Sequence, residues 1–184
     1  MSAAPTVSRA EDTARRWLEV DPDPETRTET ERLLAAGGDE LYDRFGGRLE
    51  FGTAGIRGRR GAGPMRMNRV LVRSVAAAVA EVLVATAESD PPLVVVGFDA
   101  RHKSDAFATD TARVLAARGV GSLVLPGPLP TPVLAHAVRE SGADAGVMAT
   151  ASHNPAADGG YKVYWGDGAQ IVPPIDAKIS AAID

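Results

Sequence analysis

Residues 91–155, PPLVVVGFDARHKSDAFATDTARVLAARGVGSLVLPGPLPTPVLAHAVRESGADAGVMATASHNP, carry the pattern that decides the fold. Short valine-rich runs bounded by proline and glycine alternate with longer segments whose apolar residues recur at helical spacing. A continuous apolar run such as 93–98 predicts a strand that is buried on both faces. Strands that alternate with helices through short connections predict a three-layer α/β/α domain with a mixed, mostly parallel sheet.

The same patterns predict the elements on either side of this segment. Ser104 is the predicted N-cap of the helix after the first strand. Beyond Pro155, alternating residues and a turn at 166–168 predict a β-hairpin over 160–172. The run at 121–125 predicts a second buried strand. The other predicted strands are 48–51, 93–98 and 143–149, and the predicted helices are 8–20, 24–36, 69–87, 104–118, 131–141 and 175–183.

The first 45 residues have a different character, because they are polar and helical in pattern. Asp21-Pro22-Asp23-Pro24 separates two predicted helices, and Gly37-Gly38 is the predicted end of the second helix. We therefore expect a helical N-terminal extension, 1–45, packed on a main domain, 46–184.

Composition excludes several classes of protein. The chain has 184 residues, a net charge of −4 and no cysteine, which excludes disulfides and thiolate metal sites and fits the cytoplasm. The N-terminus lacks the apolar stretch of a signal peptide, and the apolar segment 75–87 is too short to span a membrane. Nucleic-acid binding is not indicated. Six arginines without an acid lie between residues 51 and 80, which predicts either an anion site or a solvated basic face.

Three polar segments follow the predicted parallel strands. These segments are 97–104 (GFDARHKS), 125–132 (LPGPLPTP) and 150–155 (TASHNP). Ligands of open α/β sheets bind beyond the carboxyl ends of the strands, so we expect the three segments to meet at one edge.

Ser152 in TASHNP is the sharpest candidate for chemistry. The segment leaves a buried strand, so it can present the Ser152 hydroxyl rigidly, although an ordinary polar turn has the same composition. A triad serine hydrolase is a poor fit, because the chain has no G-x-S-x-G elbow and His153 is adjacent to the serine.

Phosphoryl transfer accounts for more of the residues. A phosphoserine is largely a dianion at neutral pH and needs cations and hydrogen-bond donors around it. Lys162 could exchange a proton if burial lowered its pKa, and Arg57 lies between glycines that allow a close approach. The alternatives are a solvated strand lysine and one arginine of a basic loop.

Taken together, four segments resemble the α-D-phosphohexomutase family of phosphoglucomutases and phosphomannomutases. FGTAGIRG at 51–58 is similar to the family's first active-site loop, and TASHNP matches its phosphoserine motif letter for letter. GFDARHKS and GGYKVY (159–164) resemble two further motifs. The segments occur in the family's order, and their wording is most similar to the phosphomannomutase- and phosphopentomutase-like branch.

The resemblance implies a role for each site residue. Ser152 would carry the phosphoryl group and, through that phosphate, contribute one ligand to a Mg²⁺ ion. Lys162 would be the general acid and base, His153 would assist near the phosphate, and Arg57 would bind phosphoryl oxygens. Asp99 and Arg101 would support the site without reacting.

The implied reaction interconverts the 1-phosphate and 6-phosphate of a hexose through a sugar bisphosphate, which makes the protein an isomerase. Gly159 stands where the family commonly has asparagine, and the family's later domains, with the remaining metal ligands and the sugar-selecting loop, are absent. We therefore expect no full turnover by these residues alone. A phosphopentomutase and a non-catalytic phosphosugar- or anion-binding module are the alternatives, and the sugar is left open.

Overall fold

A five-stranded mixed sheet forms the centre of the protein. The structure, a computed structural model, describes residues 7–53 and 55–183, so the start of the predicted extension, Ala54 of FGTAGIRG and Asp184 lie outside the described residues. The strand order is β1-β5-β4-β2-β3. Only β5 runs against the others, since it pairs antiparallel with β4 and β1 while β2 pairs parallel with β3 and β4. The strands are β1 Gly55–Arg59, β2 Leu93–Phe98, β3 Gly121–Pro128, β4 Ala145–Ala149 and β5 Asp158–Trp165.

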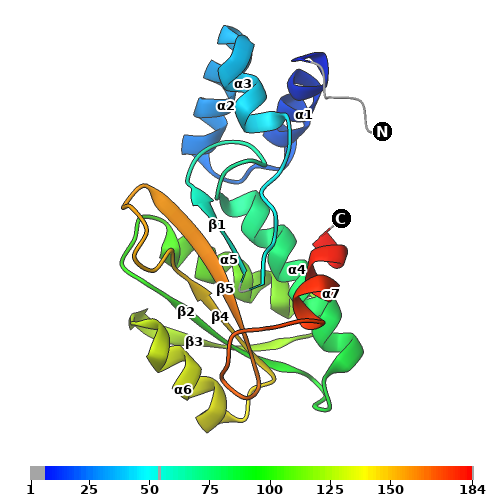
Figure 1. The fold of residues 1–184 in the computed structure, drawn as a ribbon, viewed down its shortest axis with the longest axis vertical. Coiled ribbons are helices and arrows are strands. Elements are labelled where there is room, and N and C mark those ends of the chain that lie inside the picture. Colours follow the sequence, from blue (N-terminus) through cyan, green and yellow to red (C-terminus); the bar gives the residue numbers. More distant parts are fainter. Residues whose placement is uncertain (1–6, 54, 184) are drawn as a thin grey trace.

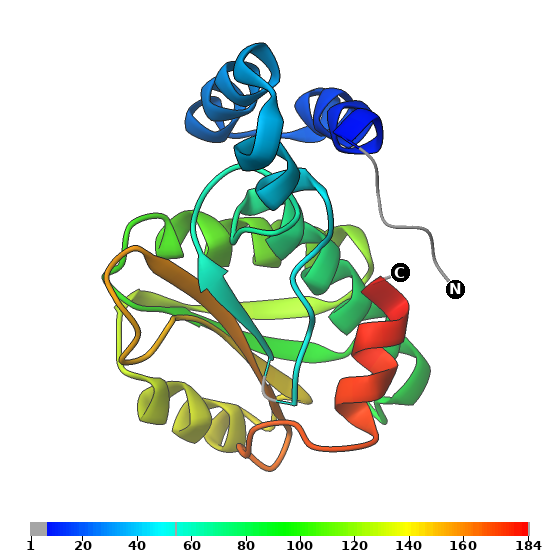
Figure 2. The same cartoon turned by 45° about the horizontal axis from the view of Figure 1, so that its top comes forward.

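Helices cover both faces of the sheet, which confirms the predicted three layers (Figures 1 and 2). One face is covered by α4 (Arg69–Thr86) and α5 (Ser104–Ala117), with α7 (Ile175–Ile183) beside α4, and the other face by α6 (Thr131–Ser141). The run in β2 supplies both cores: Val94 and Val96 join the α4–α5 cluster, and Val95 joins the α6 cluster. Within the described residues, no helix is long and apolar enough to cross a membrane.

Three N-terminal helices lie beyond one end of the sheet (Figure 1). They are α1 (Val7–Val20), α2 (Pro24–Ala36) and α3 (Gly38–Phe45), and they share a small core of their own. The end of α2 at Gly37-Gly38 is confirmed, but the sequence missed α3. Gly37, at φ 63°, redirects the chain, and Asp39 and Glu40 then favour a new helix N-terminus. The shared core consists of Ala10, Ala14, Leu33, Leu41, Phe45 and Ala62.

The predicted strand at 48–51 is wrong, because the edge strand beside β5 lies in the glycine-rich run instead. Gly55 explains the difference. It has φ 126°, and a Cβ there would lie 2.0 Å from the carbonyl oxygen of Tyr161 on β5. Only glycine allows β1 to approach β5 so closely, and strand propensity does not register such a contact.

The expectation that 121–125 is buried is also wrong. β3 is the outer strand of the sheet, and Leu123 and Val124 are each 48% exposed. An apolar run shows that a segment is a strand, but it does not show whether the strand is central or at the edge.

Two local predictions need correction. The N-cap position of α5 is occupied by Lys103, in the left-handed region, while the hydroxyl of Ser104 donates to Asp99 Oδ1 at 2.7 Å. The hairpin after β5 is shorter than predicted: Tyr164 bridges Gln170, and backbone hydrogen bonds join Trp165 to Ala169 and Ile171 to Val163, but the described residues form no strand after β5.

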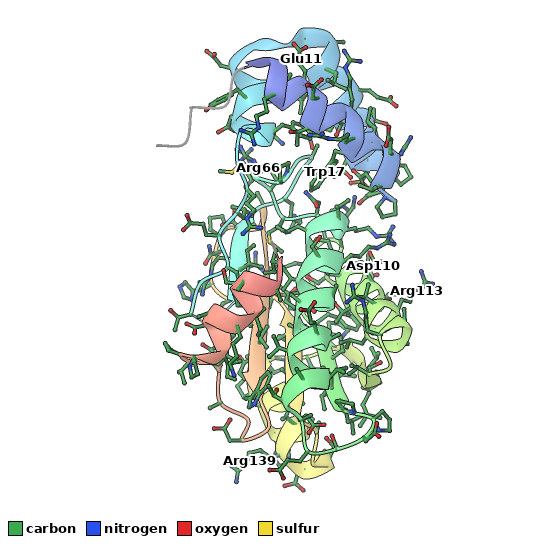
Figure 3. All side chains as sticks on the ribbon, turned by 90° about the vertical axis from the view of Figure 1, so that its right-hand side faces the viewer. Glu11, Trp17, Arg66, Asp110, Arg113 and Arg139 are labelled. Atoms are coloured by element: carbon green, nitrogen blue, oxygen red, sulfur yellow. The ribbon has the colours of Figure 1, made fainter. Side chains whose placement is uncertain are left out.

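The basic segment is divided among internal partners rather than forming one solvated face. Arg69 and Arg73 on α4 both donate to Asp110 on α5, whose side chain is fully buried, at 2.6–2.9 Å (Figure 3). Burial by itself would raise the pKa of Asp110, but the hydrogen bonds from the two guanidiniums outweigh it, and the net pKa is lowered. The ionised carboxylate therefore ties α4 to α5.

Replacing Asp110 should destabilise the fold, because Asp110→Ala leaves two arginines without their partner. We expect a loss of about 3 kcal/mol in the free energy of unfolding, measured by urea denaturation. Since the pKa of Asp110 is lowered in the folded state, its contribution should be present above pH ~4 and fade as the pH falls further. Glu81→Ala, on the exposed side of α4, is the control. Equal stability of the two variants at pH 7 would contradict the prediction.

Candidate active site

The loop after β4 presents the Ser152 hydroxyl at the surface. Ser152 is exposed and has φ 58°, a left-handed conformation that is unusual for a residue other than glycine. Its N–H donates to Thr150 Oγ1 at 2.9 Å, and that hydroxyl in turn donates to Asp99 Oδ2 at 2.7 Å. The end of β2, where Asp99 lies, therefore helps to fix the backbone that carries Ser152.

Arg101 holds the same loop from outside. Its guanidinium donates to the carbonyl oxygens of Ser152, Asn154 and Pro155 at 2.7–2.8 Å, and to that of Asp158 at 3.3 Å. The Nε of Arg101 also lies 3.2 Å from the carboxylate of Asp99. One side chain thus donates to three carbonyls of the irregular segment after β4 and to that of Asp158, the first residue of β5.

Ser152 and Lys162 line a common hollow of about 480 Å³. All three predicted loops contribute to its wall: Asp99 from the first, residues 129–132 from the second, and Thr150, Ser152 and His153 from the third. The expected convergence at the carboxyl edge of the parallel strands is confirmed. Lys162 reaches the hollow from β5, the one strand that runs in the opposite direction.

Arg57 and Lys162 lie diagonally on one face of the β1–β5 pair. Lys162 is opposite Gly55 and Arg57 is opposite Gly160, so the two side chains project from the same face two residues apart. They line a second hollow of about 290 Å³, which shares Thr150 and Lys162 with the first. Burial, and then the charge of Arg57, lower the pKa of Lys162 from its ordinary value. Both effects favour the neutral amine.

His153 and Asn154 complete the polar rim of the loop. The Nδ1 of His153 lies 3.5 Å from the Ser152 hydroxyl oxygen, at the limit of a hydrogen bond, and its ring is exposed. Arg57 Nη1 lies 3.5 Å from Asn154 Oδ1. The structure therefore gathers Ser152, His153, Lys162 and Arg57 around two adjoining hollows.

Sequence reasoning missed Arg60. This side chain donates to the carbonyl oxygens of Asp158 at 2.8 Å and Ala156 at 2.9 Å. A Cβ on Gly159 would lie 3.1 Å from its Cγ, so Arg60 packs against Gly159. Arg60 thus supplies two donors to the backbone after Ser152, and the only sequence signal was the arginine cluster.

The described residues do not by themselves fit a Mg²⁺ ion. They contain no group of three or more His, Cys, Asp or Glu side chains that could hold a metal. The carboxylate of Asp99 already accepts hydrogen bonds from Thr150, Ser104 and the N–H of Arg101, and that of Asp158 accepts one from Asn154. Oxygen ligands for a divalent cation would have to come largely from outside this part of the chain.

Comparison with known proteins agrees with this geometry. A sequence model of the family described as phosphoglucomutase/phosphomannomutase, alpha/beta/alpha domain I, matches residues 48–184. The fold and the matched segment define an α/β/α domain of the sugar-phosphate mutases, whose named members are isomerases that transfer phosphoryl groups. The chain belongs to the phosphoglucomutase/phosphomannomutase family and carries its domain I.

Individual relatives cover a wider stretch of this chain. It is 44% identical over 170 residues to a "Probable phosphoribomutase" of Schizosaccharomyces pombe (91% of this chain, 29% of that protein). It is 38% identical over 185 residues to the phosphopentomutase of Mus musculus (96% and 30%). A Thermus thermophilus structure whose name includes phosphomannomutase superposes with a TM-score of 0.69 at 35% identity (75% and 30%). The chain spans about three tenths of the length of these proteins.

The backbone of Ser152 predicts a measurable cost to stability. A left-handed conformation costs a residue with a Cβ roughly 1 kcal/mol, and glycine largely avoids that cost. We expect Ser152→Gly to raise the free energy of unfolding by about 1 kcal/mol relative to Ser152→Ala, as measured by urea denaturation. Both variants lack the hydroxyl, so the comparison isolates the backbone. A glycine variant no more stable than the alanine variant would show that the loop is unstrained.

Proposed function

We propose that this chain is the phosphoserine-bearing domain of a mutase that interconverts sugar 1-phosphates and 6-phosphates through a bisphosphate intermediate. The observation that carries the proposal is the exposed Ser152 hydroxyl in a hollow that also contains Lys162, whose pKa is lowered. Arg57 adds a cation at the adjoining hollow. A dianionic phosphate on Ser152 would face both positive side chains.

The proposed chemistry consists of two transfers. In the first, the bond between phosphorus and Ser152 Oγ breaks as a sugar hydroxyl oxygen bonds to phosphorus, giving a sugar bisphosphate. The hydroxyl proton passes to the neutral amine of Lys162, and the serine oxygen takes a proton from solvent. After the bisphosphate reorients, its other phosphoryl group is transferred to Ser152 Oγ as the serine hydroxyl returns its proton to solvent, and Lys162 protonates the sugar oxygen that is released.

The neighbouring side chains would support these transfers. Arg57 would bind phosphoryl oxygens, and the His153 ring, beside the serine oxygen, would assist by hydrogen bonding or proton transfer. Asp99 and Arg101 would hold the loop in place. Mg²⁺, on which the family generally depends, would contact this chain through the phosphate on Ser152 and neutralise charge there.

The division of labour within a longer protein is part of the proposal. Residues 46–184 would form the catalytic phosphoserine domain and residues 1–45 a helical extension. Since the relatives are about three times as long as this chain, further domains would supply the metal ligands and select the sugar. The proposed partners are the phosphosugar, the sugar bisphosphate and those domains, and the proposed compartment is the cytoplasm.

A phosphopentomutase is the second candidate, and relatives favour it specifically. The names of the Schizosaccharomyces pombe and Mus musculus relatives, each of which covers more than nine tenths of this chain, refer to phosphoribose and phosphopentose. The same Ser152 chemistry would serve a pentose, because the residues of the site would act on phosphoryl groups rather than on a sugar ring. A module that only binds phosphosugars is disfavoured by the lysine of lowered pKa in the serine's hollow.

The proposal predicts a covalent phosphate on this chain. After incubation with glucose 1,6-bisphosphate and Mg²⁺, intact-mass spectrometry should show one added phosphoryl group on the wild type and none on Ser152→Ala. Ser141→Ala, which removes a hydroxyl from α6, is the matched control and should accept the group normally. Phosphate on Ser152→Ala, or none on the wild type, would refute the assignment.

The lowered pKa of Lys162 predicts a pH dependence. The free amine acts in the first transfer, so the rate should rise with pH and level off above the pKa of Lys162. Arg57→Gln removes the second cause of the lowering, so that pKa should rise and the pH profile should move to higher pH. Lys162→Met should slow transfer by roughly 10²- to 10⁴-fold.

The measurement is the rate at which phospho-Ser152 loses its phosphate to added glucose 1-phosphate, followed by intact mass between pH 6 and 9. Arg59→Gln, on the same strand, is the control. A profile that moves to lower pH in Arg57→Gln would contradict the assigned role of Lys162.

A further inference from the structure

The N-terminal helices contact the loop that supports Ser152. Lys103 pairs with Asp23, at the start of α2, and its Nζ lies 2.9 Å from Glu25 Oε2. His102 Nε2 lies 3.2 Å from the same Glu25 oxygen. The side chain of Lys103 is only 16% exposed and that of Asp23 only 6%. Such a shielded pair is screened less by solvent than a surface ion pair.

Two other side chains of the same short segment, 99–104, form hydrogen bonds with the Ser152 loop. Asp99 accepts from Thr150, and Arg101 donates to four carbonyls between Ser152 and Asp158. Arg101 therefore reaches the Ser152 loop, while Lys103, two residues later, reaches α2. One rigid segment thus has the catalytic loop on one side and the N-terminal helices on the other.

The backbone of Lys103 is held in a costly conformation. Lys103 has φ 64° and, with Ser152, is one of two non-glycine residues with positive φ in the described chain. A left-handed residue persists where its surroundings hold it. Here the ion pairs to α2 hold it, so the strained turn depends on the N-terminal helices.

A second residue of α2 contacts another segment that supports the Ser152 loop. Glu29 on α2 accepts a hydrogen bond from the N–H of Ala62 at 2.6 Å and pairs with Arg44 at 2.8 Å. Two residues before Ala62, Arg60 donates to the carbonyls of Ala156 and Asp158. Both guanidiniums that donate to the backbone carbonyls of the 152–158 loop therefore belong to segments that α2 contacts.

We propose that the N-terminal helices, residues 7–45, position the Ser152 loop, with Lys103 as the main positioning residue. Asp23 and Glu25 hold Lys103 and thereby the 99–104 segment. Asp99 and Arg101, which belong to that segment, in turn hold the backbone of Ser152. Lys103 touches no reacting atom in this arrangement. The relevance to phosphoryl transfer rests on the proposed function, whereas the mechanical coupling does not.

Amide hydrogen exchange on the 184-residue chain tests the coupling without any phosphoryl transfer. Lys103→Met keeps the aliphatic chain and removes the charge. Exchange of the Ser152, Asn154 and Asp158 amides should become about tenfold faster, while the amides of β2 keep their wild-type rates. The control is Arg32→Met, which breaks the exposed 3.0 Å pair with Glu40 on the same helices. Loop exchange equal to that of this control would overturn the proposal.

Two further measurements keep the result decisive. Lys103→Arg retains the charge and should restore slow exchange. If Lys103→Met does not fold, Glu25→Gln, which leaves the pair with Asp23, should give a smaller acceleration confined to the same amides; no acceleration in the folded Glu25→Gln chain would overturn the proposal.

Phosphorylation by glucose 1,6-bisphosphate separates the two hypotheses. Lys103→Met should lower the saturating rate of Ser152 phosphorylation about tenfold and leave the half-saturating concentration nearly unchanged, because Lys103 does not contact the ligand. A wild type that accepts no phosphate would refute the proposed function and leave the exchange result to decide the coupling. A normal rate in Lys103→Met would refute the positioning role.

Discussion

The Asp99 carboxylate joins the two parallel strands on which the site is built. One oxygen accepts hydrogen bonds from the Arg101 N–H and the Ser104 hydroxyl, and the other accepts from Thr150. Thr150 holds the Ser152 backbone, and Arg101 holds the carbonyls that follow. Because the members of such a network polarise one another, the loss of one weakens the rest. An exposed hydroxyl can therefore stand on an irregular loop whose backbone is held by several hydrogen bonds.

Much of the architecture could be predicted, because it is encoded locally. The valine runs of β2 and β4 and the helical spacing of α4 are signals that neighbouring residues carry on their own, and α2, α6, α7 and β2 begin and end at the predicted residues. The convergence of three loops followed from the topology of parallel strands. TASHNP and GGYKVY indicated the family, and the match over residues 48–184 confirms it. The roles of Ser152 and Lys162 stay predictions.

The features that were missed depend on contacts distant in sequence. Nothing near Gly55 shows that its strand passes within 2.0 Å of Tyr161, and nothing in 121–125 shows that β3 lies at the edge of the sheet. In the sequence alone, Arg60 is only one arginine of a cluster, and Lys103 is only one residue of a motif. Their importance appears only when Asp158 and Asp23, remote along the chain, lie against them.

Successive side chains of β5 point to opposite faces of the sheet, and this alternation limits which insertions and deletions the site can tolerate. Tyr161 and Val163 point into the α4–α5 core, so Lys162 points to the opposite face, where the hollow lies. Removing or adding one residue between positions 158 and 161 would interchange the two faces, turning a lysine into the apolar interior and a core side chain toward the hollow. In descendants of this sequence, length changes should therefore be absent from β5 and confined to the turn after Trp165.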